Sequence, residues 1–566
     1  MVNLSLVLSA AALASVATAA PAKRAASATV TATAAPNAGA ATSDVWPPAN
    51  TMPDANVFPP ESVVGYQQAT PTGVEPFLAT ASSYPVRGDI YPLVVPQPSS
   101  TGSSKAAKDK KDFNIARYWG NLTPQYSVDS SKYGLDYATP AIPKNCEIVQ
   151  FHTYFRHGAR YPTSGAAPQS FADKVQNATK VDGSFSASGP LSFLNDWTYG
   201  LGAELLTPYG RLQNFKWGVA ARQLYGKLLN NMTEAGQLPV FRTQSQDRMV
   251  KTMQNFAAGF FGVPEFLDQY SLEIGVETKG LNTSGAPYEV CPNSNNARGS
   301  VGSTASTAFA TPYYEKAAAR LNQHLSGSLT LEASDIGALL QLCAYETDAF
   351  GFSDFCALFT AEEFEVFEQA FDISFSGNNG FNSPVAAAQG LGYLEEFVSR
   401  LTQTHISNYD SSANSTLDSS DVTFPLNQSI YADSAHEVAI MGALLFPLSF
   451  FPSPHSHTVP TDKLSTDHTY VASQVVPFGT IWQAQVLECQ PSVPTKQIRF
   501  IINDAVIPIH KSYKGCNEDP NGLCAFDTVV EVLKERINEI DFDYDCNANY
   551  TVPTYGQVTN GRAPRE

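Results

Sequence analysis

Residues 155–162 combine the side-chain types that phosphoryl transfer needs. Their sequence is FRHGARYP, so Arg156 and Arg160 flank His157 across Gly158. A guanidinium binds two phosphate oxygens through parallel hydrogen bonds. An imidazole held beside a phosphate can attack phosphorus and form a phosphohistidine. The alternative is a structural histidine in a charged turn whose arginines pair with surface carboxylates, but two arginines at this spacing favour the phosphate-binding interpretation.

A strand must position this run. Residues 146–154 (CEIVQFHTY) are typical of a strand, and open α/β sheets bind ligands at the carboxyl ends of their strands. Strand–helix alternation at both ends of the globular region, around a helix-rich middle, predicts an α/β fold. We expect a three-layer α/β/α sheet domain at about 140–200 and 425–546, with a large, mostly helical insertion domain at about 200–424.

The remaining elements follow from apolar periodicity and caps. The first expected helix has Thr207 as its N-cap and Pro208 in its first turn. Helices are expected at 207–229, 247–261, 312–325, 334–345, 361–371, 385–401 and 437–448, and strands at 238–241, 428–435, 475–487 and 497–502.

The N-terminal part of the chain differs in composition from the rest. Residues 4–16 are apolar and the small residues ATA follow at 17–19, which predicts a secretory signal peptide over residues 1–19. The apolar run is too short and too rich in Ala to favour a membrane span. Residues 20–112 are rich in Ala, Ser, Thr and Pro, so we expect a disordered extension. Residues 113–566 are expected to form the catalytic region.

The composition bounds the class of protein. Among 566 residues, 53 are acidic and 35 are Lys or Arg, which gives a net charge of −18. With 43% hydrophobic residues the chain can build a large core, which excludes global disorder. The acidic balance argues against nucleic-acid binding, and no later segment is apolar enough to cross a membrane. A few local arginines can still bind a small anionic substrate.

Cysteines and glycosylation motifs indicate an exported protein. There are eight cysteines and no C-x-x-C pair, so disulfides are favoured over a zinc site, although eight cysteines allow about 105 pairings. Sequons for N-linked glycans occur at Asn121, Asn177, Asn231, Asn282, Asn414, Asn427 and Asn549. The expected location is extracellular or in the cell wall.

The motif RHGxRxP resembles the signature of the histidine acid phosphatases, and the full RHGARYPT run resembles their fungal phytase branch. These proteins belong to the phosphoglycerate mutase-like superfamily. The likeness extends to residues 382–402, 475–479 and 501–509. It implies a secreted hydrolase that cleaves phosphomonoesters through a phosphohistidine, with phytate (myo-inositol hexakisphosphate) as the expected substrate. It implies no cofactor and no metal.

A second segment resembles the part of the family that supplies a further phosphate-binding arginine. This segment is FRTQSQDR at 241–248, and the match assigns the ligand to Arg242. The alternative for Arg242 is a salt bridge at the end of a strand. Arg248 begins the next expected helix and is assigned to packing or charge balance.

A third segment, YADSAHE at 431–437, resembles the family's second motif, in which a histidine precedes an aspartate. The resemblance implies that His436 binds phosphate and that Glu437 protonates the leaving group. Glu437 departs from the family pattern, which has Asp there, so this position puts the proton donor in doubt. The alternative for Glu437 is an acid at a helix N-terminus, favoured by the helix dipole.

The implied reaction has two steps. His157 attacks phosphorus while Glu437 protonates the departing oxygen, and water then cleaves the phosphohistidine. Nearby cations should keep His157 neutral in acid, and the donor must be protonated, so an acidic optimum follows. His152 is expected in the core, and His455 and His457 in a loop. The implied ligands of the phosphoryl group are Arg156, Arg160, Arg242 and His436.

The family pattern also implies a disulfide pairing that uses every cysteine. The implied pairs are Cys146–Cys489, Cys291–Cys546, Cys343–Cys356 and Cys516–Cys524.

The substrate is less well defined than the reaction. Many fungal phytases carry Lys soon after the RHGARYPT run, whereas this chain has SGAAPQ at 164–169 and no cation before Lys174. This difference keeps a broad-specificity acid phosphatase as an alternative. Two further interpretations stay open: a mutase or phosphotransferase, and an inactive secreted phosphate-binding relative in which Glu437 marks lost turnover.

Overall fold

The computed structural model describes residues 54, 56–58, 92–94, 113–181, 184–440, 458–465, 468–492 and 494–565. The predicted signal peptide, His455, His457 and nearly all of the predicted extension lie outside the described residues. Within the extension, Leu93 is buried against the helical part of the protein, and the Val94 N–H donates to the Gly351 carbonyl at 2.6 Å. Residues 92–94 therefore differ from the predicted disorder, because an apolar side chain anchors them.

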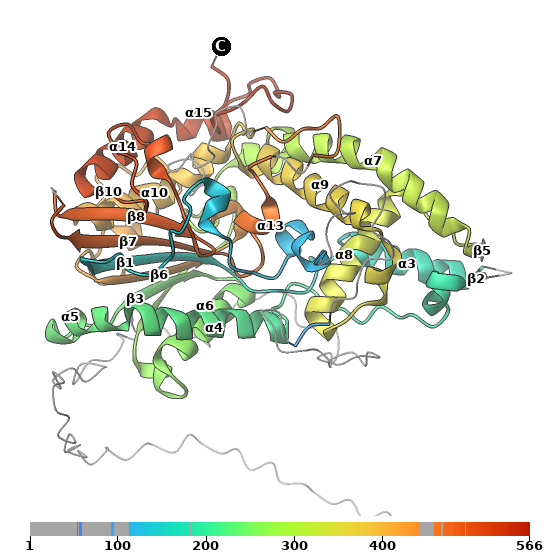
Figure 1. The fold of residues 1–566 in the computed structure, drawn as a ribbon, viewed down its shortest axis with the longest axis horizontal. Coiled ribbons are helices and arrows are strands. Elements are labelled where there is room, and N and C mark those ends of the chain that lie inside the picture. The colour runs from blue at the N-terminus through green and yellow to red at the C-terminus, as the bar shows by residue number, and fades with distance from the viewer. Residues whose placement is uncertain are drawn as a thin grey trace, which may run out of the picture. The chain divides into compact units, whose positions relative to one another are not determined.

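One mixed sheet lies at the centre of the catalytic region (Figure 1). Its strand order is β10-β8-β7-β1-β6-β3-β4, with β9 beside β8. The four strands on one side are parallel: β1 (Cys146–Arg156), β6 (Ile430–Ala435), β3 (Val240–Gln244) and β4 (Ser271–Gly275). The others pair antiparallel: β7 (Ile481–Cys489), β8 (Lys496–Ile502), β9 (Ala505–Val506) and β10 (Cys524–Ala525). The carboxyl ends of β1, β6 and β3 therefore share one edge.

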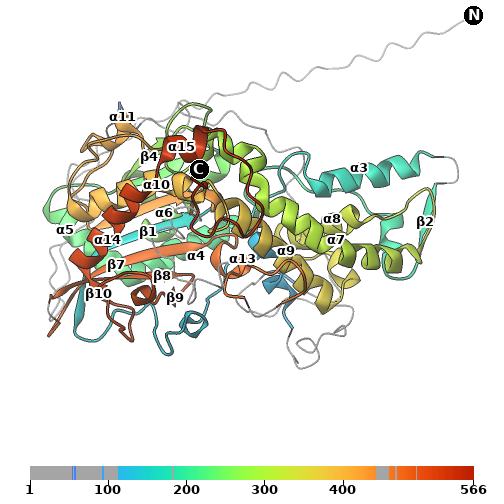
Figure 2. The same cartoon turned by 90° about the horizontal axis from the view of Figure 1, so that it is seen from above.

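Helices cover both faces of this sheet (Figures 1 and 2). On one face α4 (Pro208–Tyr225) packs against α6 (Asp247–Phe261), and on the other α10 (Ala386–Thr402) packs against α14 (Phe526–Glu539). Side chains of β1 alternate between the two layers, so Phe155 joins the core under α4 and α6 while Tyr154 joins the core under α10. The predicted three-layer α/β/α arrangement is confirmed.

The helical insertion lies beside the sheet domain (Figure 2). It contains α7 (Val301–Asn322), α8 (Ala333–Phe350), α9 (Ala361–Asn379) and α3 (Ala167–Thr179), and the small sheet of β2 (Phe185–Ala187) and β5 (Leu325–Gly327). Its bounds differ from the predicted 200–424. The segment from α4 to β4 belongs to the sheet domain because β3 pairs with β6, and α10 covers the sheet.

Capping residues and apolar periodicity predicted the first residues of most helices and strands correctly. The Thr207 side chain accepts from the Gly210 N–H and caps α4, and α6 spans the predicted residues. By contrast, α7 begins before its predicted start at residue 312. The prediction took Pro312 as the first helical residue, whereas the proline lies inside the helix. The predicted strand at 475–487 is wrong in its first half, where α13 (Ala472–Val475) ends and a turn follows. The short helices are α5 (Leu229–Glu234), α11 (Ser415–Asp418) and α15 (Phe542–Asn547).

All four predicted disulfides form. Cys146–Cys489 joins the paired first residue of β1 and last residue of β7, and the other bonds are Cys291–Cys546, Cys343–Cys356 and Cys516–Cys524. Among the described residues, no helix has both the length and the apolar character that a membrane span requires.

Candidate active site

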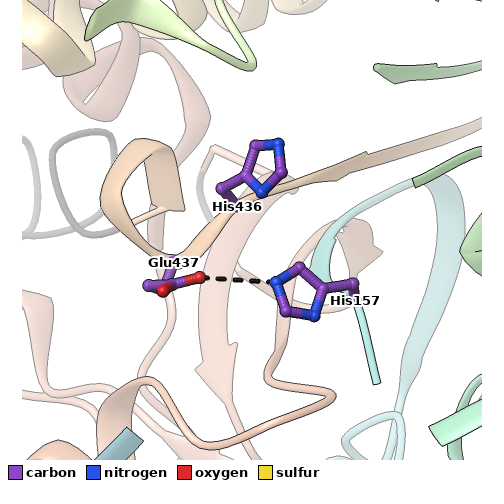
Figure 3. Close-up of side chains that lie close together, drawn as sticks. All are labelled: His157, His436 and Glu437. Carbon is purple, nitrogen blue, oxygen red and sulfur yellow. Dashed lines mark ion pairs between the residues drawn. The ribbon is translucent and has the colours of Figure 1, made fainter. Parts of the chain in front are cut away.

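Two histidines meet at the carboxyl edge of the sheet. Arg156 of β1 pairs with Ala435 of the parallel strand β6, so His157 and His436 each follow the end of a strand. Their ring centroids lie 5.7 Å apart. Figure 3 shows both rings turned toward a common space, with the Glu437 carboxylate beside His157. The predicted convergence of residues 156–157 and 436–437 is therefore present.

The hydrogen bonding of His157 leaves one ring nitrogen available for attack. Nδ1 lies 2.9 Å from the Gly158 carbonyl oxygen, so Nδ1–H donates and Nε2 keeps its lone pair. Nε2 is buried and has no hydrogen-bond partner among the described residues, and Glu437 Oε2 is 3.5 Å away. Burial lowers the pKa of His157 far below its usual value, and the Arg156 charge adds to this effect against the opposing Glu437. His157 therefore stays neutral in mild acid.

Glycines fix the turn that carries His157. A Cβ on Gly158 would collide with the Gly210 carbonyl, and a Cβ on Gly210 would collide with the Ala159 carbonyl. The Thr207 hydroxyl also donates to the Ala159 carbonyl at 3.2 Å. The turn and the first turn of α4 therefore pack backbone against backbone, which only glycine permits.

Arg156 is fully buried and held on three sides. Nε donates to Glu437 Oε2 at 2.9 Å, and Nη1 donates to the carbonyls of Asn121 and Val476, the latter at 2.8 Å. The guanidinium lies 4.5 Å from the centre of the Phe478 ring. Nη2 is buried without a hydrogen-bond partner in the described chain. A fixed guanidinium with one open N–H group is suited to bind an anion.

Arg160 and Arg248 supply two more open donors. Arg160 Nη1 donates to the Tyr161 carbonyl at 2.8 Å, and Arg248 Nη1 donates to Glu204 at 3.0 Å. Within the described residues, the Nε of each arginine is buried and has no hydrogen-bond partner. Burial lowers the pKa of Arg248, and the nearby charge of Arg160 lowers it further. Two adjacent cations of this kind are stabilised by an anion between them.

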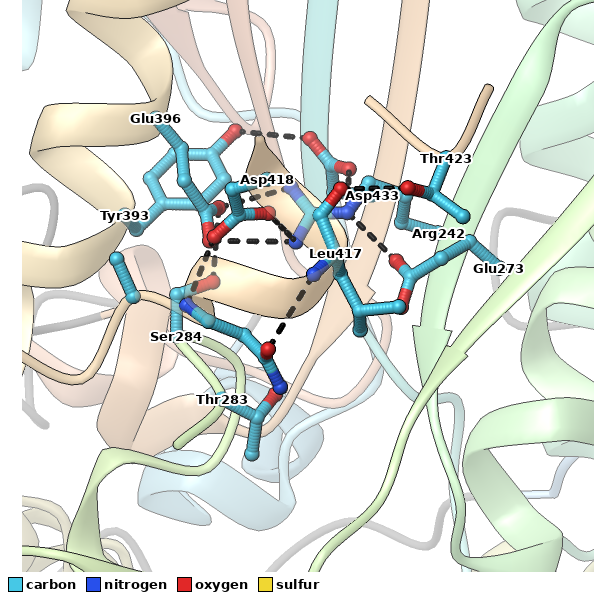
Figure 4. A network of polar contacts seen from close by, with 12 residues as sticks. Arg242, Glu273, Thr283, Ser284, Tyr393, Glu396, Leu417, Asp418, Thr423 and Asp433 are labelled. Atoms are coloured by element: carbon cyan, nitrogen blue, oxygen red, sulfur yellow. Dashed lines mark hydrogen bonds and ion pairs between the residues drawn. The ribbon is translucent and has the colours of Figure 1, made fainter. Parts of the chain in front are cut away.

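Arg242 does not supply a donor to this pocket (Figure 4). Its Nε donates to Glu273 at 2.7 Å, Nη1 to Glu396 at 2.9 Å and Nη2 to Asp418 at 3.3 Å. Asp433 lies 4.0 Å from Nε. This placement contradicts the prediction that Arg242 binds phosphate, and the salt-bridge alternative holds.

Arg248, and not Arg242, has a guanidinium nitrogen without a hydrogen-bond partner in the described residues. Arg242 lies within β3 opposite Asp433 of β6, below the sheet edge, whereas Arg248 stands beyond the strand end in the first turn of α6. The charge of Arg248 acts on His157. Arg248 was assigned to packing or charge balance, and its ion pair with Glu204 fits charge balance. Its open Nε adds a candidate anion donor that was not expected, because the likeness of the segment did not distinguish its two arginines.

The Glu437 carboxylate lies between Arg156 and His157, with Oε2 at 2.9 Å from Arg156 Nε and 3.5 Å from His157 Nε2. Glu437 follows the end of β6, and a helical turn begins there, so the helix N-terminus interpretation holds as well. Burial alone would raise the pKa of Glu437, but the guanidinium charges of Arg156 and Arg160 hold that pKa well below its usual range. Without a bound anion, the side chain is therefore a carboxylate.

Glu277 is a site residue that the sequence did not reveal. Its Oε2 lies 2.9 Å from His436 Nε2 and accepts from the Tyr288 hydroxyl, also at 2.9 Å. Glu277 follows β4 in a loop without a recognisable motif, so no local signal pointed to it.

The same side chains could in principle offer ligands to a metal. His157, His436 and Glu437 each present one ligand atom, and these atoms lie within 4.8 Å of one another. The guanidinium groups of Arg156, Arg160 and Arg248 give this space a positive potential that suits an anion better than a cation.

Two more sequence predictions concern the surroundings of the pocket. His152 is fully buried and stacks on Tyr431 at 4.7 Å, as expected for a core residue. Lys174, the first cation after the RHGARYPT run, is paired with Asp335 at 2.6 Å. The positive charge of Lys174 is therefore already neutralised.

The fold and the pocket define a class: an α/β/α enzyme with a histidine and several guanidinium groups arranged around a phosphoryl-sized anion. Residues 147–503 match the model of the Histidine phosphatase superfamily (branch 2), and the chain belongs to this family. It is a phosphoric monoester hydrolase of the phytase and acid phosphatase kind.

The relatives span most of the chain. Phytase A of Aspergillus oryzae is 29% identical over 435 residues, which are 74% of this chain and 88% of that protein. Phytase PHO112 of Candida albicans is 30% identical over 464 residues, 78% of this chain and 89% of that protein. The crystal structure of the phytase from D. castellii has the same fold, with a TM-score of 0.62 at 24% identity over 82% of this chain and 94% of its own.

Proposed function

We propose that the protein is a secreted histidine-type acid phosphatase that hydrolyses phytate through a phosphohistidine on His157. One observation carries this proposal. His157 Nε2 is buried without a hydrogen-bond partner in the described chain, and so is one guanidinium nitrogen of each of Arg156, Arg160 and Arg248, whose charges act on His157 or on Glu437 beside it. A phosphoryl group would satisfy these donors and place phosphorus next to the nucleophile.

In the first step, His157 Nε2 forms a bond to phosphorus and the ester P–O bond breaks. Arg156, Arg160 and Arg248 hold the phosphoryl oxygens and stabilise the charge of the transition state. The electron pair of the broken bond goes to the leaving oxygen, which takes a proton from Glu437. In the second step, water attacks phosphorus, Glu437 takes the proton of the water, and phosphate and neutral His157 are released.

Glu437 must gain a proton after the substrate binds. Its low pKa in the free enzyme comes from the guanidinium charges of Arg156 and Arg160. A bound phosphate brings negative charge beside the carboxylate and takes over these partners, so the pKa of Glu437 rises. Activity in acid follows from this sequence of events.

The choice of phytate is supported by the relatives, which are named phytases. The pairing of Lys174 with Asp335 supports the alternative, a broad-specificity acid phosphatase, because a hexaphosphate rewards free cations near the pocket. Measured kcat/KM values for phytate and for p-nitrophenyl phosphate at acid pH distinguish the two. A higher value for phytate is expected, and a clear preference for the aryl phosphate would favour the alternative.

His157→Ala tests the chemistry in the same assay. Loss of activity on both substrates is expected, because His157 supplies the lone pair that attacks phosphorus. Retained activity would refute the assignment of His157. A wild-type protein that binds inorganic phosphate but hydrolyses neither ester would be the inactive relative.

Secretion with N-linked glycans is also proposed. The disulfides support it, as does the exposure of sequon asparagines. Asn121 is buried, so mass spectrometry of glycopeptides should find it unmodified. The exposed sites, expected to be occupied, are Asn177, Asn231, Asn427 and Asn549.

A further inference from the structure

Glu277 contacts His436 on the side that faces away from His157. His436 Nε2 lies 2.9 Å from Glu277 Oε2, and the two side chains are 5% and 1% exposed. In Figure 3 one ring nitrogen of His436 points toward His157 and Glu437, and the other points away from them. Since Nε2 is engaged by Glu277, Nδ1 is the nitrogen that faces the pocket.

Glu277 is itself fixed as an acceptor. The Tyr288 hydroxyl donates to Oε2 at 2.9 Å, and the Gln246 N–H donates to Oε1 at 3.3 Å. The Glu277 N–H donates to the Ser245 hydroxyl at 2.9 Å. Burial alone would raise the pKa of Glu277, but His436 and the hydrogen bonds it receives hold that pKa below its usual value. Glu277 is therefore a carboxylate at the pH of the reaction.

The position of this carboxylate determines what His436 can offer to a phosphate. A neutral ring that donates Nε2–H to Glu277 has a lone pair on Nδ1, and this lone pair would repel a phosphoryl oxygen. An imidazolium donates from both nitrogens at once, to Glu277 on one side and to the phosphoryl group on the other. The buried carboxylate balances its charge, as buried ion pairs require.

We propose that Glu277 is a positioning residue that keeps His436 as an imidazolium with its Nδ1–H directed at the phosphoryl group of the substrate. The inference rests on the proposed function for the identity of that anion. The contacts of Glu277 with residues 245, 246 and 288 leave a purely structural role as the competing interpretation. The titratable groups that face His436 or Glu277 are Tyr288 and Glu289 after β4, Arg248 of α6, His157 after β1, and Glu437 after β6.

The direct test is the protonation state of His436 by ¹⁵N NMR in wild type and Glu277→Gln, without substrate. At one and the same pH, the His436 signals are expected to show a larger imidazolium fraction in wild type than in Glu277→Gln, because only the wild-type carboxylate balances the charge of the ring. Glu277→Asp, which restores the charge, should recover part of the imidazolium. Glu395→Gln is the matched control, because Glu395 is a buried acid bonded to Ser411 outside the site. Identical His436 signals in wild type and Glu277→Gln would overturn the proposal. If Glu277→Gln does not fold, wild type is compared with Glu277→Asp, whose shorter side chain should lower the imidazolium fraction of His436. Unchanged signals in that comparison would also overturn the proposal.

Inhibition by inorganic phosphate gives a second readout. Losing a charge-assisted donor should raise the inhibition constant about 10-fold or more in Glu277→Gln and move its pH dependence to lower pH. A merely structural change would weaken inhibition equally at every pH and would contradict the proposal. The NMR result does not need turnover. If wild type hydrolysed no phosphate ester while His436 still responded to Glu277, the proposed function would fail and the positioning role would stand.

Discussion

Two arginines six positions apart in one segment have opposite surroundings. Arg242 is enclosed by carboxylates, whereas Arg248 keeps an open N–H group next to Arg160. A phosphate ligand must have a donor to spare, and only the second arginine does. The direction of each side chain, which depends on the register of β3 and the start of α6, decided the difference.

Arg248→Ala and Arg242→Ala should therefore fail in different ways. Arg248→Ala should raise the inhibition constant of phosphate roughly 10- to 100-fold and lower Tm less than Arg242→Ala, because it loses the ligand contact and a single ion pair with Glu204. Arg242→Ala leaves buried carboxylates unpaired and should cost roughly 3–5 kcal/mol of stability. Thermal unfolding and phosphate inhibition measure both effects. A stable Arg242→Ala variant with a selective loss of phosphate affinity would reverse this assignment.

The role of Glu437 can be tested through the leaving group. Glu437→Gln removes the proton donor, so hydrolysis of a poor leaving group such as an inositol alkoxide should slow by about 10²–10⁴. A nitrophenolate leaves without a proton, so its release should slow much less. Glu437→Asp, which restores the usual family residue, serves as the control and should stay active on both substrates. Equal losses on both substrates in Glu437→Gln would show that Glu437 acts in another way.

At the scale of elements, the site depends on the ends of parallel strands. The strand patterns at 146–154 and 428–435 predicted β1 and β6, and their parallel pairing brings His157 and His436 together. The sequence could not predict that β3 lies on the other side of β6, because a strand of five residues carries no pairing information. Glu277 was missed for the same reason, since it reaches His436 only through the pairing of β4 with β3.

Helix α9 links the two chain segments whose carbonyl groups bind Arg156. Glu368 of α9 accepts the N–H groups of Gly120 and Ser473 at 2.7 and 2.9 Å. The carbonyls of Asn121 and Val476, close by in the same two segments, hold Arg156 Nη1. Glu368 therefore joins the two segments whose carbonyls hold Arg156.

Glu368→Ala should lower kcat/KM on any phosphomonoester about 10-fold, because a loosened Arg156 loses a charge-assisted contact. Glu315→Ala, an exposed acid on α7, is the control and should change little. Steady-state kinetics on both variants make the comparison. Wild-type kinetics in a folded Glu368→Ala variant would exclude this supporting role.

At the scale of the whole molecule, buried acidic side chains with raised pKa values stabilise the folded state in mild acid. Burial raises the pKa of Glu368 to about 8, and the pKa of Glu346 and Glu395 to about 7. Such groups bind protons more tightly in the folded state, so their stabilisation is lost as pH rises from about 4.5 to 8. Burial lowers the pKa of His152 and His157, which weakens the fold only below about pH 6.5.

Tm should therefore fall as pH rises from about 6.5 to 8.5, where the buried acids lose their protons in the folded state. Differential scanning calorimetry across this range measures the slope. Glu346→Gln removes one of these groups and should flatten it. A Tm that rises through this window would contradict the account of the buried acids.

The layered architecture was predictable and its domain boundaries were not. Strand–helix alternation predicted the sheet domain with its helical insertion, and the family pattern predicted all four disulfides. The boundaries failed because α4, β3, α6 and β4 return to the sheet between parts of the insertion. Helical periodicity is the same in both domains, so it carries no information about which domain a helix joins.

The central claim is that His157 forms a covalent bond to phosphorus during turnover. Wild-type protein mixed with a phosphomonoester at acid pH, quenched in alkali and digested for mass spectrometry, tests it most directly. The account predicts a phosphoryl group on the peptide that contains His157, and none in His157→Ala. A phosphoryl group on another residue, or turnover without any labelled histidine, would contradict it.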